Sequence, residues 1–153
     1  MYPGSFHVAV ALHKAADNGV IDAAALEATS KGTALYVDAV RHLQEFRKAL
    51  AASPAAAELP ASFSLGCVDS QLWTRYLQSN GRVRVDIHTD GPAKGEAVVL
   101  TGEPVLTEIL AGRLSVDRAL ADGMILIEGG ENEKTAIRHA LIATTMANKI
   151  SWQ

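Results

Sequence analysis

Apolar residues recur at helical spacing through the first third of the chain. The pattern predicts helices at about residues 5–18, at 23–29 behind an Asp22 cap, and from Thr33 to Ala52. The third helix carries an apolar stripe along its whole length, formed by Leu35, Tyr36, Ala39, Val40, Leu43, Phe46, Ala49 and Leu50. In the first helix, Val8 and Leu12 lie on one side and Phe6 and Val10 on another.

The pattern changes to alternation after residue 60. Phe63 and Leu65 alternate with serines, and every second residue from Val83 to Thr89 is suited to a core, which predicts half-buried strands. Residues 69–80 between them fit both structures. The helical reading, slightly favoured by the period, aligns Leu72, Trp73, Tyr76 and Leu77, whereas the strand reading aligns Trp73, Arg75 and Leu77. Both remain open at this point.

The stretch from Glu96 to Leu141 has the clearest boundaries. Val98–Leu100 predicts a strand, and Pro104 begins a helix that Gly112 ends in the left-handed conformation. Ser115 caps a short second helix that ends at Gly123. The unbroken apolar run Met124–Ile127 predicts a strand buried on both faces. Asn132 is expected to cap a last helix whose apolar face holds Ala136, Ile137, Ala140 and Leu141.

This stretch resembles the later part of the sterol carrier protein type 2 family. The matching features, in order, are Ala111-Gly112-Arg113, Ala119-Leu120, Gly123, Ile125 to Ile127 and Gly129. The resemblance implies an α+β fold: a five-stranded, mostly antiparallel sheet covered by helices, with an apolar cavity for a lipid-like ligand. It also implies that residues 69–80 form a strand ending in an Asn80-Gly81 hairpin turn.

Residues 1–60 would then form an extra N-terminal helical arm, and residues 61–153 the sterol-carrier-like α+β region of one compact domain. Ser53-Pro54 and Leu59-Pro60 bracket the boundary between them. This arm is longer than the single leading helix usual in the family, so it could serve as a lid, a dimer interface or a surface for a protein partner.

Composition excludes several classes of function. The net charge of −3 and the lack of a basic stripe argue against nucleic-acid binding. No apolar run is long enough to predict a transmembrane segment. A single cysteine, Cys67, allows no intramolecular disulfide. No signal-peptide pattern precedes the first helix, and Ser151-Trp152-Gln153 is not a peroxisomal tripeptide, so we expect a cytoplasmic protein.

Residues that carry chemistry are scattered. No nucleophile elbow, phosphate loop or metal-binding helix motif is present, and the five histidines have no spacing typical of metal ligands. Cys67, between Gly66 and Val68, is typical of a small buried hydrophobe. We therefore expect no catalytic residue, no metal and no cofactor.

The sequence thus predicts a non-enzymatic protein that binds a lipid or another apolar small molecule in an internal cavity. Candidates for the cavity lining are Phe63, Trp73, Leu106, Ile109, Leu110, Leu120, Ile125 and Ile127. The same residues also fit an ordinary filled core. The alternative is an interaction or assembly module, an accessory or scaffold protein that forms a homodimer or binds a protein partner through the Thr33 to Ala52 helix.

Overall fold

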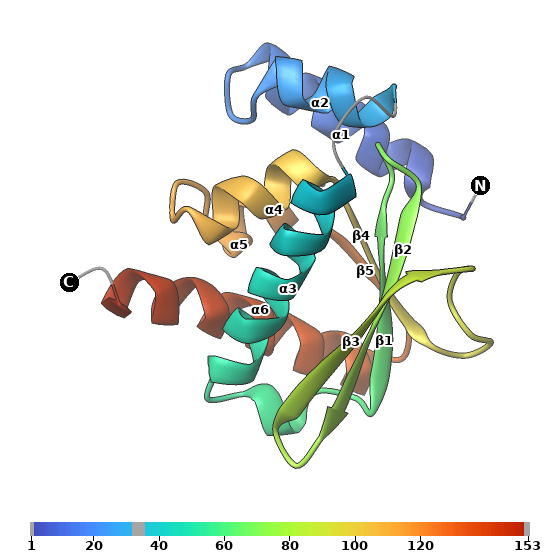
Figure 1. Cartoon of the computed structure of the whole chain (residues 1–153), viewed down its shortest axis with the longest axis vertical. Coiled ribbons are helices and arrows are strands. Elements are labelled where there is room, and N and C mark those ends of the chain that lie inside the picture. Colours follow the sequence, from blue (N-terminus) through green and yellow to red (C-terminus); the bar gives the residue numbers. More distant parts are fainter. Residues whose placement is uncertain (1, 32–35, 152–153) are drawn as a thin grey trace.

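The computed structural model describes residues 2–31 and 36–151, in which α3, α4, α5 and α6 lie on one side of a five-stranded sheet and α1 and α2 lie at one end of it (Figure 1). The predicted α+β class is confirmed. The elements, in chain order, are α1 (Ser5–Asp17), α2 (Ala23–Ser30), α3 (Tyr36–Ala52), a 3₁₀ turn (Ala56–Glu58), β1 (Ser62–Cys67), β2 (Leu72–Ser79), β3 (Arg82–Thr89), β4 (Ala97–Thr101), α4 (Glu103–Leu110), α5 (Val116–Ala121), β5 (Leu126–Glu128) and α6 (Glu131–Ser151).

The sheet is mixed, with the strand order β3-β2-β1-β4-β5. β1 and β4 are parallel, and the other neighbouring pairs are antiparallel, as predicted. A parallel pair requires a crossover connection, here residues 90–96 between β3 and β4. This crossover lies on the sheet face away from α3, because Arg75 on that face donates to the Gly91 carbonyl at 3.0 Å.

The core lies between the sheet and α3, α4 and α6 (Figure 1). Tyr76 of β2 stands at its centre, stacked on Phe63 with ring centroids 5.4 Å apart and in edge contact with Phe46 of α3 at 5.7 Å. Its hydroxyl donates to the Leu43 carbonyl at 3.1 Å. The stripe residues Ala39, Leu43, Phe46 and Leu50 of α3 are therefore core, and the described exposed side of this helix is polar, with Arg41, Glu45 and Lys48. Residues 33–35 of the predicted helix lie outside the described residues.

Residues 72–79 form a strand, which settles the alternative left open by the sequence. β2 pairs with β1 on one side and with β3 on the other. Asn80 and Gly81 both have positive φ, 53° and 82°, as a two-residue hairpin turn of this kind requires. Ladder pairing on two sides thus outweighs the helical period of the apolar residues.

The predicted caps of two short helices are confirmed. The Asp22 side chain accepts from the N–H of Ala24 at the start of α2, and Ser115 accepts from the N–H of Arg118 in α5. Gly112 ends the α4 turn with a φ of 77°, in the left-handed region as expected.

Two boundaries differ from the sequence prediction. β5 is a three-residue, half-buried edge strand, Leu126–Glu128, and not a strand buried on both faces. Met124 and Ile125 are buried just before it, in a turn where both N–H groups donate to the Ala119 carbonyl. Helix α6 begins at Glu131, so Asn132 lies within its first turn and is not its cap.

Candidate functional site

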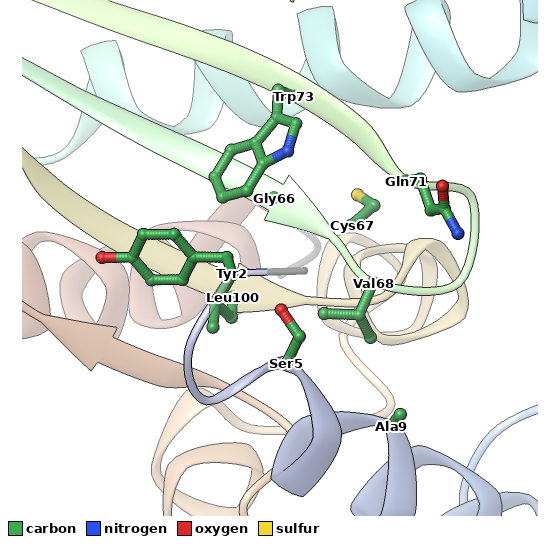
Figure 2. A pocket seen from close by; sticks show the side chains of 9 residues that line it. All are labelled: Tyr2, Ser5, Ala9, Gly66, Cys67, Val68, Gln71, Trp73 and Leu100. Atoms are coloured by element: carbon green, nitrogen blue, oxygen red, sulfur yellow. The ribbon is translucent and has the colours of Figure 1, made fainter. Parts of the chain in front are cut away.

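A pocket of about 380 Å³ opens between the N-terminal segment and the sheet face opposite α3 (Figure 2). Three parts of the chain that are distant in sequence build it. Its lining residues are Tyr2, Ser5 and Ala9 from the N-terminal segment and α1, Gly66, Cys67, Val68, Gln71 and Trp73 from β1, β2 and the turn between them, and Leu100 from β4. Most of this lining is apolar, as in pockets for apolar small molecules.

Gly66 shapes the wall formed by the two strands. It pairs with Trp73 across the sheet, and a Cβ at this position would lie 2.8 Å from the indole ring and 3.2 Å from Leu100. The missing side chain therefore lets the indole lie over β1 (Figure 2). Tyr2 meets the same indole edge-on, with ring centroids 5.6 Å apart. Two aromatic rings thus form one end of the pocket.

The opposite wall depends on how closely α1 approaches the sheet. Gly4, just before α1, has a φ of 90°, and a Cβ there would lie 2.7 Å from Oε1 of Glu128 and 2.8 Å from Leu126. Val8 and Leu12 anchor the helix, since each is only 1% exposed. Phe6 and Val10 of α1 are instead exposed, at 69% and 52%.

Two polar side chains enter the pocket lining. Ser5 is 6% exposed and lines the pocket. Figure 2 shows it between Leu100 and Val68. Gln71 holds the left-handed conformation with a φ of 60°, and its N–H donates to the Cys67 carbonyl at 2.7 Å. Its exposed side chain stands at the far end from Tyr2.

The environment of the pocket is acidic. Burial raises the pKa of Cys67 well above its usual value, and the charges of Asp69 and Glu103 raise it further. Cys67 is therefore a neutral thiol and a poor nucleophile. Burial also raises the pKa of Tyr2, with added effects from the charge of Glu128 and a hydrogen bond to it.

Asp69 connects three elements beneath the pocket. It accepts a hydrogen bond from the Thr29 hydroxyl of α2 at 2.5 Å and from the Glu103 N–H at the start of α4 at 3.3 Å. Burial raises the pKa of Glu103, and the charge of Asp69 adds to this effect. Asp69 thus caps α4 with its own negative charge.

A second polar cluster lies beyond Trp73 on the same sheet face. Glu96, with its side chain 3% exposed, accepts from Nε of Arg75 at 3.0 Å and from the hydroxyl of Ser62 at 2.7 Å, and also from Ser64. Burial disfavours the charged form of Glu96 and by itself would raise the pKa of this carboxyl. The hydrogen bonds from Ser64, Ser62, Arg75 and the Ala93 N–H outweigh the effect of burial, and the pKa of Glu96 is lowered. Arg75 is therefore paired with Glu96 through Nε and also donates to the Gly91 carbonyl.

The structure divides the predicted lining residues among three places. Trp73 lines the pocket described above. Leu120, Ile125 and Ile127 line a second pocket of about 400 Å³ between α5, β5 and α6, whose walls also carry charged residues. Phe63, Leu106 and Ile109 are buried in the core, and Leu110 packs against it. The other residues of the first pocket were missed because only strand pairing and the packing of α1 bring them together.

The described part of the chain shows neither a metal site nor a membrane-spanning helix. There, no group of three or more His, Cys, Asp or Glu side chains is placed to hold a metal ion. Among the same residues, no helix is both long and apolar enough to cross a membrane.

Comparisons with known proteins give likenesses in fold. No family model and no curated protein matches the sequence. Among solved structures, the chain is similar to sterol carrier protein 2, with 20% identity over 72% of this chain and 93% of that one and a TM-score of 0.49. It is also similar to the ubiquinone synthesis protein UbiJ-SCP2, with 14% identity over 67% and 87% of the two chains and a TM-score of 0.46.

A third likeness is to the sec-alkylsulfatase Pisa1 from Pseudomonas sp., with 18% identity over 59% of this chain and a TM-score of 0.42. The matched region is 14% of the sulfatase chain, so this chain corresponds to a small part of that enzyme. Sterol carrier protein 2 belongs to the family that the sequence from Glu96 to Leu141 resembles.

Proposed function

We propose that this protein binds an apolar small molecule or lipid, without catalysing a reaction, in the pocket between α1 and the sheet. The observation that carries this proposal is the lining itself: two aromatic rings, aliphatic side chains and a glycine floor around about 380 Å³. Each Å² of apolar surface that a guest buries there contributes about 25 cal/mol. The sequence resemblance described above implies the same class of ligand.

The chemistry near the pocket supports binding and gives no support to catalysis. Its thiol is kept neutral by burial and by two neighbouring carboxylates, and Glu96 is committed to Arg75 and two serines. An aromatic wall with few polar groups is the usual composition of a site that holds its ligand mainly by burial.

The alternative, an assembly module that binds through the Thr33 to Ala52 helix, stays a prediction. Between residues 39 and 52, the most buried stripe residues of this helix pack into the core, so a partner would meet mainly polar side chains on that part of it.

A pair of matched substitutions tests the proposal. Ala9 of α1 lines the first pocket and Ala121 of α5 lines the second, so Ala9→Phe and Ala121→Phe each place a large ring in one of them. The assay is a fluorescence titration with the neutral dye Nile red. We expect wild type and Ala121→Phe to bind the dye with the same affinity. Ala9→Phe should lose at least about ten-fold in affinity, because its phenyl ring occupies the volume that the dye needs. Circular dichroism checks that both variants are folded.

Two results would overturn the proposal: no saturable binding of the dye to wild type, or a loss of binding in Ala121→Phe alone. The second result would move the ligand site to the pocket between α5, β5 and α6.

A further inference from the structure

The charges around the first pocket restrict the kind of ligand it accepts. None of its nine lining residues is Lys, Arg or His. His7 and His13 of α1 are exposed and are not among them. The cation nearest along β2, Arg75, is two residues beyond Trp73 and is paired with Glu96. A ligand with a carboxylate or phosphate head would therefore find no counter-charge in this lining.

Helix α1 begins at the pocket, α4 begins three residues after the lining residue Leu100, and helix N-termini normally attract anions. Here each is already matched by a carboxylate of the chain. Glu128 lies beside Gly4 at the start of α1, with Oε1 2.7 Å from the position of a Cβ on that glycine. Asp69 accepts from the first N–H of α4. Each helix start thus already has a carboxylate of the chain beside it.

The pocket still offers hydrogen bonds to an uncharged head group. Ser5, a residue only 6% exposed, brings a hydroxyl to the lining, and the Gln71 side chain stands on the other side of Val68 (Figure 2). A hydroxyl or carbonyl oxygen on the ligand can pair with the serine hydroxyl or the glutamine amide without bringing a negative charge near Asp69 and Glu128.

We propose that the pocket selects uncharged amphiphiles, with an apolar body and a hydroxyl or carbonyl head, and rejects fatty acids and other anionic lipids. The apolar body lies against Trp73, Tyr2 and Leu100, and the head group lies toward Ser5 and Gln71. This inference rests on the proposed function, because it concerns the same site.

Three ligands with the same alkyl chain test this selectivity. Dodecanol, dodecyltrimethylammonium and dodecanoate are each used to displace Nile red at neutral pH, the alcohol below its solubility limit and the two ions below their critical micelle concentrations. We expect dodecanol to compete at least about ten-fold better than dodecanoate, and the cation also to compete better than the anion, because unpaired like charges repel in a partly buried site. Both ions lose solvation when they enter the pocket, so a difference in affinity between the cation and the anion reports the charge repulsion.

Single substitutions locate the effect. Gln71→Lys places a cation at the pocket, and we expect it to tighten dodecanoate binding about ten-fold, the size of an opposite charge at a partly buried site. Ala52→Lys adds the same charge at the exposed last residue of α3 and should change nothing. Ser5→Ala should weaken dodecanol about five-fold, the value of one hydrogen bond, and leave the cation unaffected.

The outcomes separate this inference from the proposed function. Saturable dye binding with dodecanoate equal to or better than dodecanol, or with the anion equal to the cation, would overturn the selectivity and leave the binding function standing. Displacement by none of the three ligands would also overturn the selectivity. Absence of dye binding to wild type would overturn the function itself.

Discussion

Thr74→Val is predicted to stabilise the protein. Thr74 is 0% exposed on the helix-facing side of β2, and its hydroxyl has no hydrogen-bond partner among the described residues. A buried hydroxyl without a partner costs about 1–3 kcal/mol in protein mutational data, and valine keeps the shape of threonine and the branching that suits a strand. We expect the free energy of unfolding to rise by about 1 kcal/mol and Tm by about 2–4 °C.

Thr101→Val is the matched control. Thr101 is also 0% exposed and on a central strand, but its hydroxyl donates to the Met124 carbonyl at 2.9 Å. Removing this donor leaves a buried acceptor without its partner, so we expect a loss of about 1–3 kcal/mol. Urea unfolding followed by circular dichroism measures both variants. Equal destabilisation by the two substitutions would refute the reasoning, because it would mean that the Thr74 hydroxyl has a stabilising partner.

Two further predictions concern the sheet face that carries the pocket. Glu96→Gln should lower stability by about 2 kcal/mol at neutral pH, because the charged carboxylate accepts hydrogen bonds from Arg75 and two serines. The pKa of Glu96 is lowered in the folded protein, so this contribution is complete above the ordinary value of 4.5 and is lost as the pH falls below it. Urea unfolding over this pH range should show the two proteins converging in acid, and a constant difference would contradict the assignment. Gly66→Ala should weaken Nile red binding several-fold with little change in stability, because the added methyl meets the end of the movable Trp73 ring; unchanged affinity in the dye titration would argue against this wall of the pocket.

Local signals in the sequence were enough to predict most elements. Asp22 and Ser115 cap helices whatever surrounds them, and Gly112 ends one because only glycine adopts the left-handed conformation without cost. The strand at residues 72–79 could not be decided locally, since its apolar spacing also fits a helix and its ladder partners are distant in sequence.

The candidate site was the least predictable part. Trp73, a large ring near the middle of the chain, lines the first pocket, but its neighbours there come from residues 2–9 and from β4. Periodicity identifies which residues are buried and does not identify which faces meet. Phe63 and Trp73 are both on strands of the sheet, yet they lie on opposite faces, one in the core and one in the pocket.

The measurement that tests the central claim most directly is photo-crosslinking with a dodecanol derivative carrying a diazirine on its alkyl chain, followed by peptide mapping. The account predicts label on peptides containing Tyr2, Trp73 and Leu100, with protection by excess dodecanol and loss of label in Ala9→Phe. Label confined to Leu120, Ile125 and Ile127, or label that dodecanol does not compete away, would contradict it.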